Sequence, residues 1–289
     1  MTVRMERSAD EPDERPAVDE PVGESHDVVL YPIFEGHSSH TFEIARDIAE
    51  GAGAKLLVLD LYAHSDEIVD ESQRVARDLL ATHLDDSHDV PVETHYERTD
   101  DPVDAVITVA REYETRLIVF DEHTPESLVH PLANDVPNRI SDRVETDAVT
   151  VERTRDDRVS SILVPFAGGP HSGLAVAIAG AIARSTDAVV ELFHVTEDDG
   201  TDASVDELFE QARERLPDGV AVDTWHLDRP DVADAIIEQS AHYDLTIVGE
   251  PSRGRLKRFL FGSVTDTVRS DSSNTVLVSR RSNGDPFNC

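Results

Sequence analysis

The chain has 289 residues, of which 39% are hydrophobic, enough to form one or two domains with substantial cores. Its 60 acidic residues outnumber 26 basic ones, which gives a formal net charge of -34. A chain this acidic repels nucleic acid and anionic membranes, so neither is expected as a partner. The acid excess is instead typical of a protein that works in multimolar salt, where short Debye lengths screen self-repulsion. We therefore expect a protein of halophilic type.

The N-terminal segment, residues 1–25, is acidic and contains several prolines but almost no bulky apolar residues. Because such a composition cannot bury enough apolar surface to offset the entropy of ordering, we predict a disordered tail. Cys289 is the only cysteine, which excludes an internal disulfide. The sequence shows no signal peptide and no apolar run of roughly 18 residues, so we expect a soluble, cytoplasmic protein without membrane insertion.

From residue 26 onward the sequence is an internal repeat, with a first copy at 26–154, a second at 157–281 and a flexible C-terminal tail at 282–289. Four apolar segments of the first copy have counterparts in the second: 27–32 with 160–165, 54–59 with 187–192, 117–121 with 246–250, and 148–151 with 275–278. The repeat predicts two similar domains in tandem.

Each copy alternates predicted strands and helices, and the first strands are nearly continuous apolar runs, as in parallel sheets that are covered on both faces. This pattern predicts an α/β fold with two tandem doubly wound parallel sheets of Rossmann-like type. Pro102 and Pro230 are expected to occupy the first position of the third helix in each copy, and Ser172 is expected to cap the first helix of the second copy, as Ser39 starts its counterpart.

The last strand of each copy, 148–151 and 275–278, would leave main-chain donors and acceptors open at a sheet edge. A tandem chain can satisfy both edges by pairing them with each other. We therefore predict an intramolecular pseudo-dimer joined through these two strands, and further assembly into a homo-oligomer stays open.

A glycine motif in the second copy has the features of an anion site. An apolar strand ends at Gly249, a loop follows, and Gly262 and Ser263 open a helix. Gly249 lets a ligand approach the main chain, while the helix start offers donors in a positive field. In doubly wound sheets, ligands bind beyond the carboxyl ends of the strands, where this motif falls.

The motif resembles the signature of the universal stress protein family: glycine, two residues, glycine, nine residues, then glycine and serine or threonine. Gly249, Ser252, Gly262 and Ser263 stand in these places, with Ser252 departing from the expected glycine. The resemblance covers both copies and implies an adenine nucleotide alpha hydrolase-like fold that binds ATP or a related adenine nucleotide. It implies contacts from Pro165, Phe166, Ala167, Val195, Val248, Gly249, Ser252, Gly262, Ser263 and Val264.

Two further features bear on this site. Arg253 begins the densest basic run of the chain, and a guanidinium group there would neutralise phosphate charge. Ala167 replaces an aspartate that the family usually carries after the first strand, so no metal ligand is assigned.

The first copy has Phe120 where the second has Gly249, followed by the carboxylates of Asp121, Glu122 and Glu126. These would repel a polyphosphate, so we interpret the first copy as structural or regulatory.

Two other functions stay open. One is a regulatory or scaffolding protein that binds no nucleotide, such as a regulator of transport acting on an unknown protein partner. The other is an adenylating enzyme, because residues 167–172 resemble the pyrophosphate loop of ATP-pyrophosphatase enzymes, with Ala167 and His171 in place of its serine and aspartate. The sequence indicates no catalytic residues. His37 and His40 lack an evident third metal ligand.

Overall fold

In this computed structural model, the described residues are 27–34, 39–62, 90–121, 136–153, 158–196, 202–250 and 274–287. The first half contains β1 (Val28–Ile33), α1 (Ser39–Ala52), β2 (Lys55–Tyr62), β3 (Val92–Arg98), α3 (Pro102–Glu112), β4 (Leu117–Asp121), α4 (Val136–Val144) and β5 (Asp147–Arg153). The second half contains β6 (Ser161–Pro165), α5 (Pro170–Thr186), β7 (Val189–Thr196), α6 (Asp202–Arg213), β8 (Val222–Asp228), α7 (Val232–Ser240), β9 (Leu245–Gly249) and β10 (Thr275–Arg280). The predicted N-terminal tail lies outside these residues.

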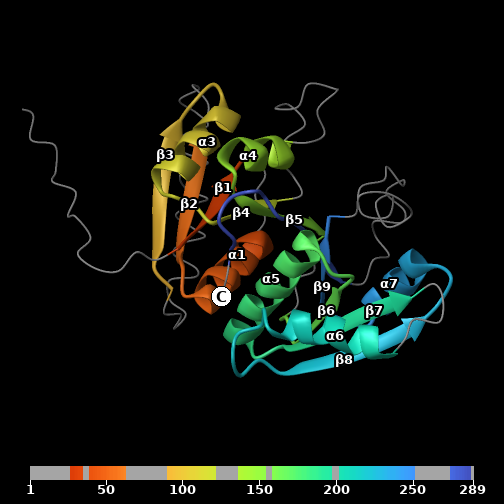
Figure 1. The fold of residues 1–289 in the computed structure, drawn as a ribbon. Helices are drawn as coiled ribbons and strands as arrows, with labels where there is room; N and C mark the ends of the chain where they lie inside the picture. The colour runs from red at the N-terminus through yellow and green to blue at the C-terminus, as the bar shows by residue number, and fades with distance from the viewer. Residues whose placement is uncertain are drawn as a thin grey trace, which may run out of the picture.

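The strands form one sheet in the order β3-β2-β1-β4-β5-β10-β9-β6-β7-β8 (Figure 1). Neighbouring strands are parallel except at the centre, where β5 and β10 run antiparallel, with Leu277 opposite Val151. Each half therefore repeats one doubly wound strand order, and the two halves meet through their last strands. The predicted α/β fold class is confirmed, and the two edges that the sequence left open are paired with each other.

One face of the sheet carries a core that both halves share. Helices α1 and α5 lie side by side over the centre of the sheet (Figure 1). Buried residues of both helices belong to one hydrophobic cluster that also contains apolar side chains from strands of both halves. At the helix contact, a Cβ on Gly51 would lie 1.7 Å from the carbonyl oxygen of Ala181, so the two backbones touch. The opposite face of the first half is covered by α3 and α4.

Three predicted helix starts can be compared with the structure. Pro102 is at the start of α3 behind the cap Asp101, as expected. Helix α7, however, begins at Val232 with Asp231 as its cap, because this carboxylate accepts the amide of Asp234 at 3.2 Å. Pro230 therefore precedes the cap, and its prediction is wrong.

The prediction that Ser172 caps α5 is also wrong. The helix begins at Pro170, and the cap position is Gly169, whose φ of 87° a serine would rarely adopt. Ser172 lies inside the first turn, where its hydroxyl donates to the carbonyl oxygen of Gly168 at 2.5 Å. The pair of positive-φ glycines, Gly168 and Gly169, shapes the entry into the helix in place of a side-chain cap.

The C-terminal segment is not a free tail over residues 282–287, which corrects the sequence interpretation. It crosses to the first half (Figure 1), where Phe287 is 2% exposed and belongs to the shared core. The main-chain amides of Ser282 and Phe287 donate to the two carboxylate oxygens of Asp147 at 2.8 and 3.0 Å. Apolar burial and these bonds to a buried carboxylate fix the segment.

Asp60 on β2 is a buried carboxylate whose pKa the protein raises. Its side chain is 1% exposed and neither oxygen has a hydrogen-bond partner in the described part of the chain, so burial raises the pKa from 3.8 to about 6. Between these two pH values the folded protein holds a proton that the unfolded chain releases. The free energy of unfolding therefore falls as pH rises through this window, by about 3 kcal/mol at most.

Asp60→Asn is expected to remove this dependence. The variant should match the wild-type free energy of unfolding near pH 4 and exceed it above about pH 6, because only the ionised carboxylate is penalised. Denaturant unfolding in multimolar KCl at both pH values measures the difference, with the exposed Asp223→Asn as control. An equal gain at both pH values would contradict the assignment.

Candidate functional site

The candidate site lies where β6 and β9 separate. These neighbouring strands pair only at Ile162 with Leu245 and at Leu163 with Thr246, although both continue towards their carboxyl ends. They are the strands at which the order of the second half changes direction, with β7 on one side and β10 on the other. Such a switch point is where doubly wound sheets form a ligand crevice.

The structure brings the described members of the predicted site to this edge of the sheet. Pro165 ends β6, Val195 is next to the end of β7, and Val248 and Gly249 end β9. Ala167 is exposed, whereas Val248 is buried in a cluster with Val276 and Val278. The predicted site residues that lie outside the described part of the chain are Ser252, Arg253, Gly262, Ser263 and Val264.

The side chain of Phe166 is buried in the core, and its main chain bonds to β7. Its side chain is 3% exposed, its amide donates to the carbonyl oxygen of Phe193 at 2.8 Å, and its carbonyl oxygen lies 2.8 Å from Nδ1 of His194. Because a carbonyl oxygen only accepts, this bond assigns the proton to Nδ1 of His194. Both main-chain groups of Phe166 are thus bonded to β7.

Gly249 has a packing role that the sequence did not indicate. A Cβ at this position would lie 2.6 Å from the amide nitrogen of Ser172 and 2.7 Å from the carbonyl carbon of His171. The end of β9 therefore presses directly against the first turn of α5. Absence of a side chain at Gly249 brings the start of this helix into the crevice, whether or not a ligand also approaches the glycine.

The loop before α5 does not offer the groups of an adenylating enzyme. The hydroxyl of Ser172 is committed to the carbonyl oxygen of Gly168, and the ring of His171 accepts the main-chain amide of Arg281 at Nδ1, 3.0 Å away. The Ser172 hydroxyl is therefore occupied within the loop, and His171 supplies no carboxylate at the position of the aspartate. The resemblance to the pyrophosphate loop is therefore limited to its two glycines.

Sequence reasoning missed a polar cluster at the ends of β7 and β8. The rings of His194 and His226 stack with centroids 5.8 Å apart. Nε2 of His226 lies 3.0 Å from the hydroxyl of Thr196 and 3.4 Å from a carboxylate oxygen of Asp228. The sequence shows polar residues at alternate positions of both strands. Which of them face each other depends on the register between β7 and β8, which the sequence does not give. No group of three or more histidine, cysteine, aspartate or glutamate side chains that could hold a metal ion is found among the described residues.

Strand registers correct the comparison of the two copies. Leu117 pairs with Val29 on β1, and Leu245 pairs with Ile162, the counterpart of Val29 on β6. Counting four residues onward from each leucine places Asp121, rather than Phe120, at the position of Gly249. Phe120 instead points into the core beneath α3 and α4 and is fully buried, so it does not block the crevice.

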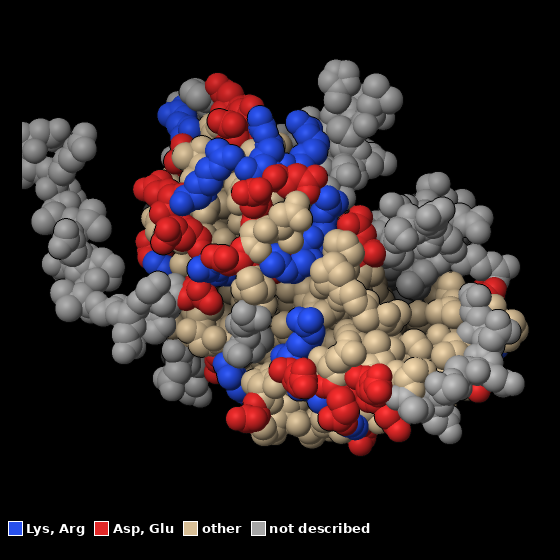
Figure 2. Space-filling view, in the orientation of Figure 1, with Lys and Arg blue, Asp and Glu red and all other residues tan. Residues whose placement is uncertain are grey.

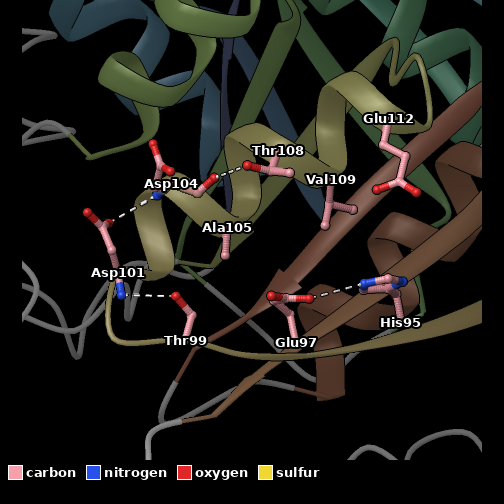
Figure 3. A pocket seen from close by; sticks show the side chains of 9 residues that line it. All are labelled: His95, Glu97, Thr99, Asp101, Asp104, Ala105, Thr108, Val109 and Glu112. Carbon is pink, nitrogen blue, oxygen red and sulfur yellow. Dashed lines mark hydrogen bonds and ion pairs between the residues drawn. The ribbon is translucent and has the colours of Figure 1, made fainter.

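The first half has a separate cavity of about 270 Å³ between β3 and α3 (Figure 3). Its lining is His95, Glu97, Thr99, Asp101, Asp104, Ala105, Thr108, Val109 and Glu112. Four carboxylates would repel a phosphate group, and His95 lies 3.5 Å from Glu97 rather than opening towards a ligand. This cavity is therefore not a nucleotide site.

The charged side chains on one face of the protein are mixed in sign. On the face shown in Figure 2, basic side chains are interspersed with acidic ones over the first half and the lower rim of the second. The described residues on this face show no continuous basic surface of the kind that binds nucleic acid. Among the helices in the described ranges, none is long and apolar enough to span a bilayer.

Fold and crevice together define a pair of Rossmann-like units joined edge to edge in one sheet. Residues 159–280 match the family described as the Universal stress protein family, which supports that family for the second half. No curated protein matches the chain.

Several solved structures share the fold across both halves. A universal stress protein from Archaeoglobus fulgidus DSM 4304 has a TM-score of 0.58 at 17% identity, with 90% of this chain and 98% of that one covered. The cytoplasmic domain of a prokaryotic cation chloride cotransporter has a TM-score of 0.61 at 12% identity, with 91% and 98% covered. A functionally unknown protein from Pseudomonas aeruginosa PAO1 has a TM-score of 0.50 at 16% identity, with 88% and 92% covered. At these identities the likeness is one of fold.

Proposed function

We propose that the second half binds ATP or a related adenine nucleotide and that the protein acts in the cytoplasm as a stress-response or regulatory sensor, not as an enzyme. The observation that carries this proposal is the separation of β6 from β9, with the glycine motif beginning at the carboxyl end of β9. The base and ribose would lie at the ends of β6, β7 and β9. The phosphates would meet the motif that continues through Gly262 and Ser263.

The first half has another role in this proposal. Asp121 is 6% exposed at the position of Gly249, and a carboxylate there opposes phosphate binding. The same half supplies β5 to pair with β10 and α1 to pack on α5. The first half therefore serves as the fixed half of a pseudo-dimer. An unknown protein partner would recognise whether the second half has bound nucleotide.

Isothermal titration calorimetry of the full chain with ATP, ADP and AMP tests the proposal. It is best done in multimolar KCl, since the charge of -34 fits a salt-adapted protein. We expect saturable binding of one nucleotide per chain and its loss in Gly262→Asp, which puts a carboxylate where phosphate is proposed to sit.

Thr224→Asp is the matched control, because it adds the same charge on the exposed edge strand β8. It should bind as the wild type does. No saturation at millimolar nucleotide in the wild type would overturn the proposal and favour the regulatory or scaffolding alternative.

A further inference from the structure

The start of α5 is held by the end of β10 as well as by Gly249. The hydroxyl of Ser279 donates to the carbonyl oxygen of His171 at 3.0 Å, and the amide of Arg281 donates to Nδ1 of the same residue at 3.0 Å. Because a main-chain amide can only donate, Nδ1 must carry the lone pair. His171 is thus bonded through its carbonyl oxygen to Ser279, at the end of β10, and through its ring to Arg281, which follows β10.

Arg281 reaches the other half with its side chain. Nη1 donates to Oδ1 of Asp147 at 2.7 Å and to the carbonyl oxygen of Ser282 at 2.9 Å, while Nη2 donates to that of Gly284 at 2.6 Å. Asp147 has 0% side-chain exposure. Since an uncompensated buried carboxylate is costly, the guanidinium group has little freedom to leave.

The two sets of contacts meet in one residue. The amide of Arg281 bonds the ring of His171 at the start of α5 in the second half, and its guanidinium group bonds a buried carboxylate at the start of β5 in the first half. Immobilising the side chain restricts the backbone that holds His171. A helix start that is already fixed loses less conformational entropy when a ligand binds against it.

We propose that Arg281 is a positioning residue: anchored by Asp147 of the first half, it holds the first turn of α5 in place for ligand binding in the second half. The consequence for ligand affinity rests on the proposed function, whereas the positioning itself does not. Through Arg281, the first half would affect ligand binding in the second half. A half that only packed against the second would have no such effect.

Hydrogen exchange of the ligand-free full chain tests the positioning. Asp147→Asn should raise exchange by about tenfold or more at the first hydrogen-bonded amides of α5, from Gly173 onward, and much less in β7. Asp142→Asn, which removes the exposed carboxylate paired with Arg280, should leave these amides unchanged.

His171→Ala supplies a second test, because it removes the ring that Arg281 holds without touching Asp147. It should raise exchange at the same amides, and the double variant with Asp147→Asn should exchange no faster than the faster single variant. Additive effects, a uniform rise over the whole chain, or no rise at α5 would each overturn the proposal.

Calorimetry with ATP on the same variants separates this proposal from the function on which it rests. If the wild type binds ATP, Asp147→Asn should weaken binding several-fold and Asp142→Asn should not. If the wild type binds no nucleotide, the proposed function fails, and the exchange result still decides whether Arg281 positions α5.

Discussion

Gly51→Ala is expected to destabilise the protein by about 3 kcal/mol or more, because it separates the two central helices. The added Cβ would lie 1.7 Å from the carbonyl oxygen of Ala181 and 2.9 Å from its Cα. These are backbone atoms, which cannot rotate away as a side chain would. Helices α1 and α5 must move apart, and the shared core between the halves must open with them.

Gly53→Ala is the matched control two residues away. No atom lies within 4 Å of a Cβ at this position, but its φ of 66° disfavours alanine. Only the backbone strain of about 1 kcal/mol is therefore expected there. Chemical denaturation in multimolar KCl measures both variants, and equal losses would show that the helix contact is not as close as the structure places it.

Asp147→Ala is expected to cost about 3–5 kcal/mol, the effect of breaking a buried ion pair from one side. The substitution leaves the guanidinium group of Arg281 without its carboxylate and takes the acceptor from the amides of Ser282 and Phe287. The C-terminal segment should detach, and Phe287 should become accessible to protease.

Asp285→Asn provides the comparison for this pair. Asp285 also binds an arginine, Arg116, at 2.7 Å, but its side chain is 79% exposed. A solvated pair contributes little to stability, and less in high salt. If the two substitutions destabilised the protein equally, burial of Asp147 would not be what fixes the segment.

The fold could be predicted because its signals are local and repeated. Apolar runs at matching intervals specify the parallel strands, and an open edge in each copy suggested that the last strands pair with each other, as β5 and β10 do. These features depend on patterns of residue type within a few positions of one another, which sequence alone contains.

Details that depend on register or on competing caps were predicted less well. Phe120 was assigned to the position of Gly249 because apolar runs align equally well one residue apart, and only the pairing with β1 and β6 places Asp121 there. Ser172 has the right chemistry for a cap, but two positive-φ glycines turn the chain into α5 before it.

The side-chain contact between Arg281 and Asp147, which also joins the halves, had no sequence signal. Arg281 is one arginine beside another in a polar terminus, and Asp147 is one of many acids. Their partnership arises because the antiparallel pairing of β10 with β5 brings the end of one strand to the start of the other. The stacked histidines of β7 and β8 were missed for the same reason.

Photolabelling tests whether the nucleotide binds at the proposed place in the second half. The full chain in multimolar KCl is irradiated with an azido derivative of ATP, digested, and its labelled peptides are identified by mass spectrometry. We expect label on peptides that contain the ends of β6, β7 or β9, or the motif from Gly249 to Ser263, and loss of this label when unlabelled ATP competes. Label confined to the first half, or label that ATP does not displace, would contradict the proposed placement.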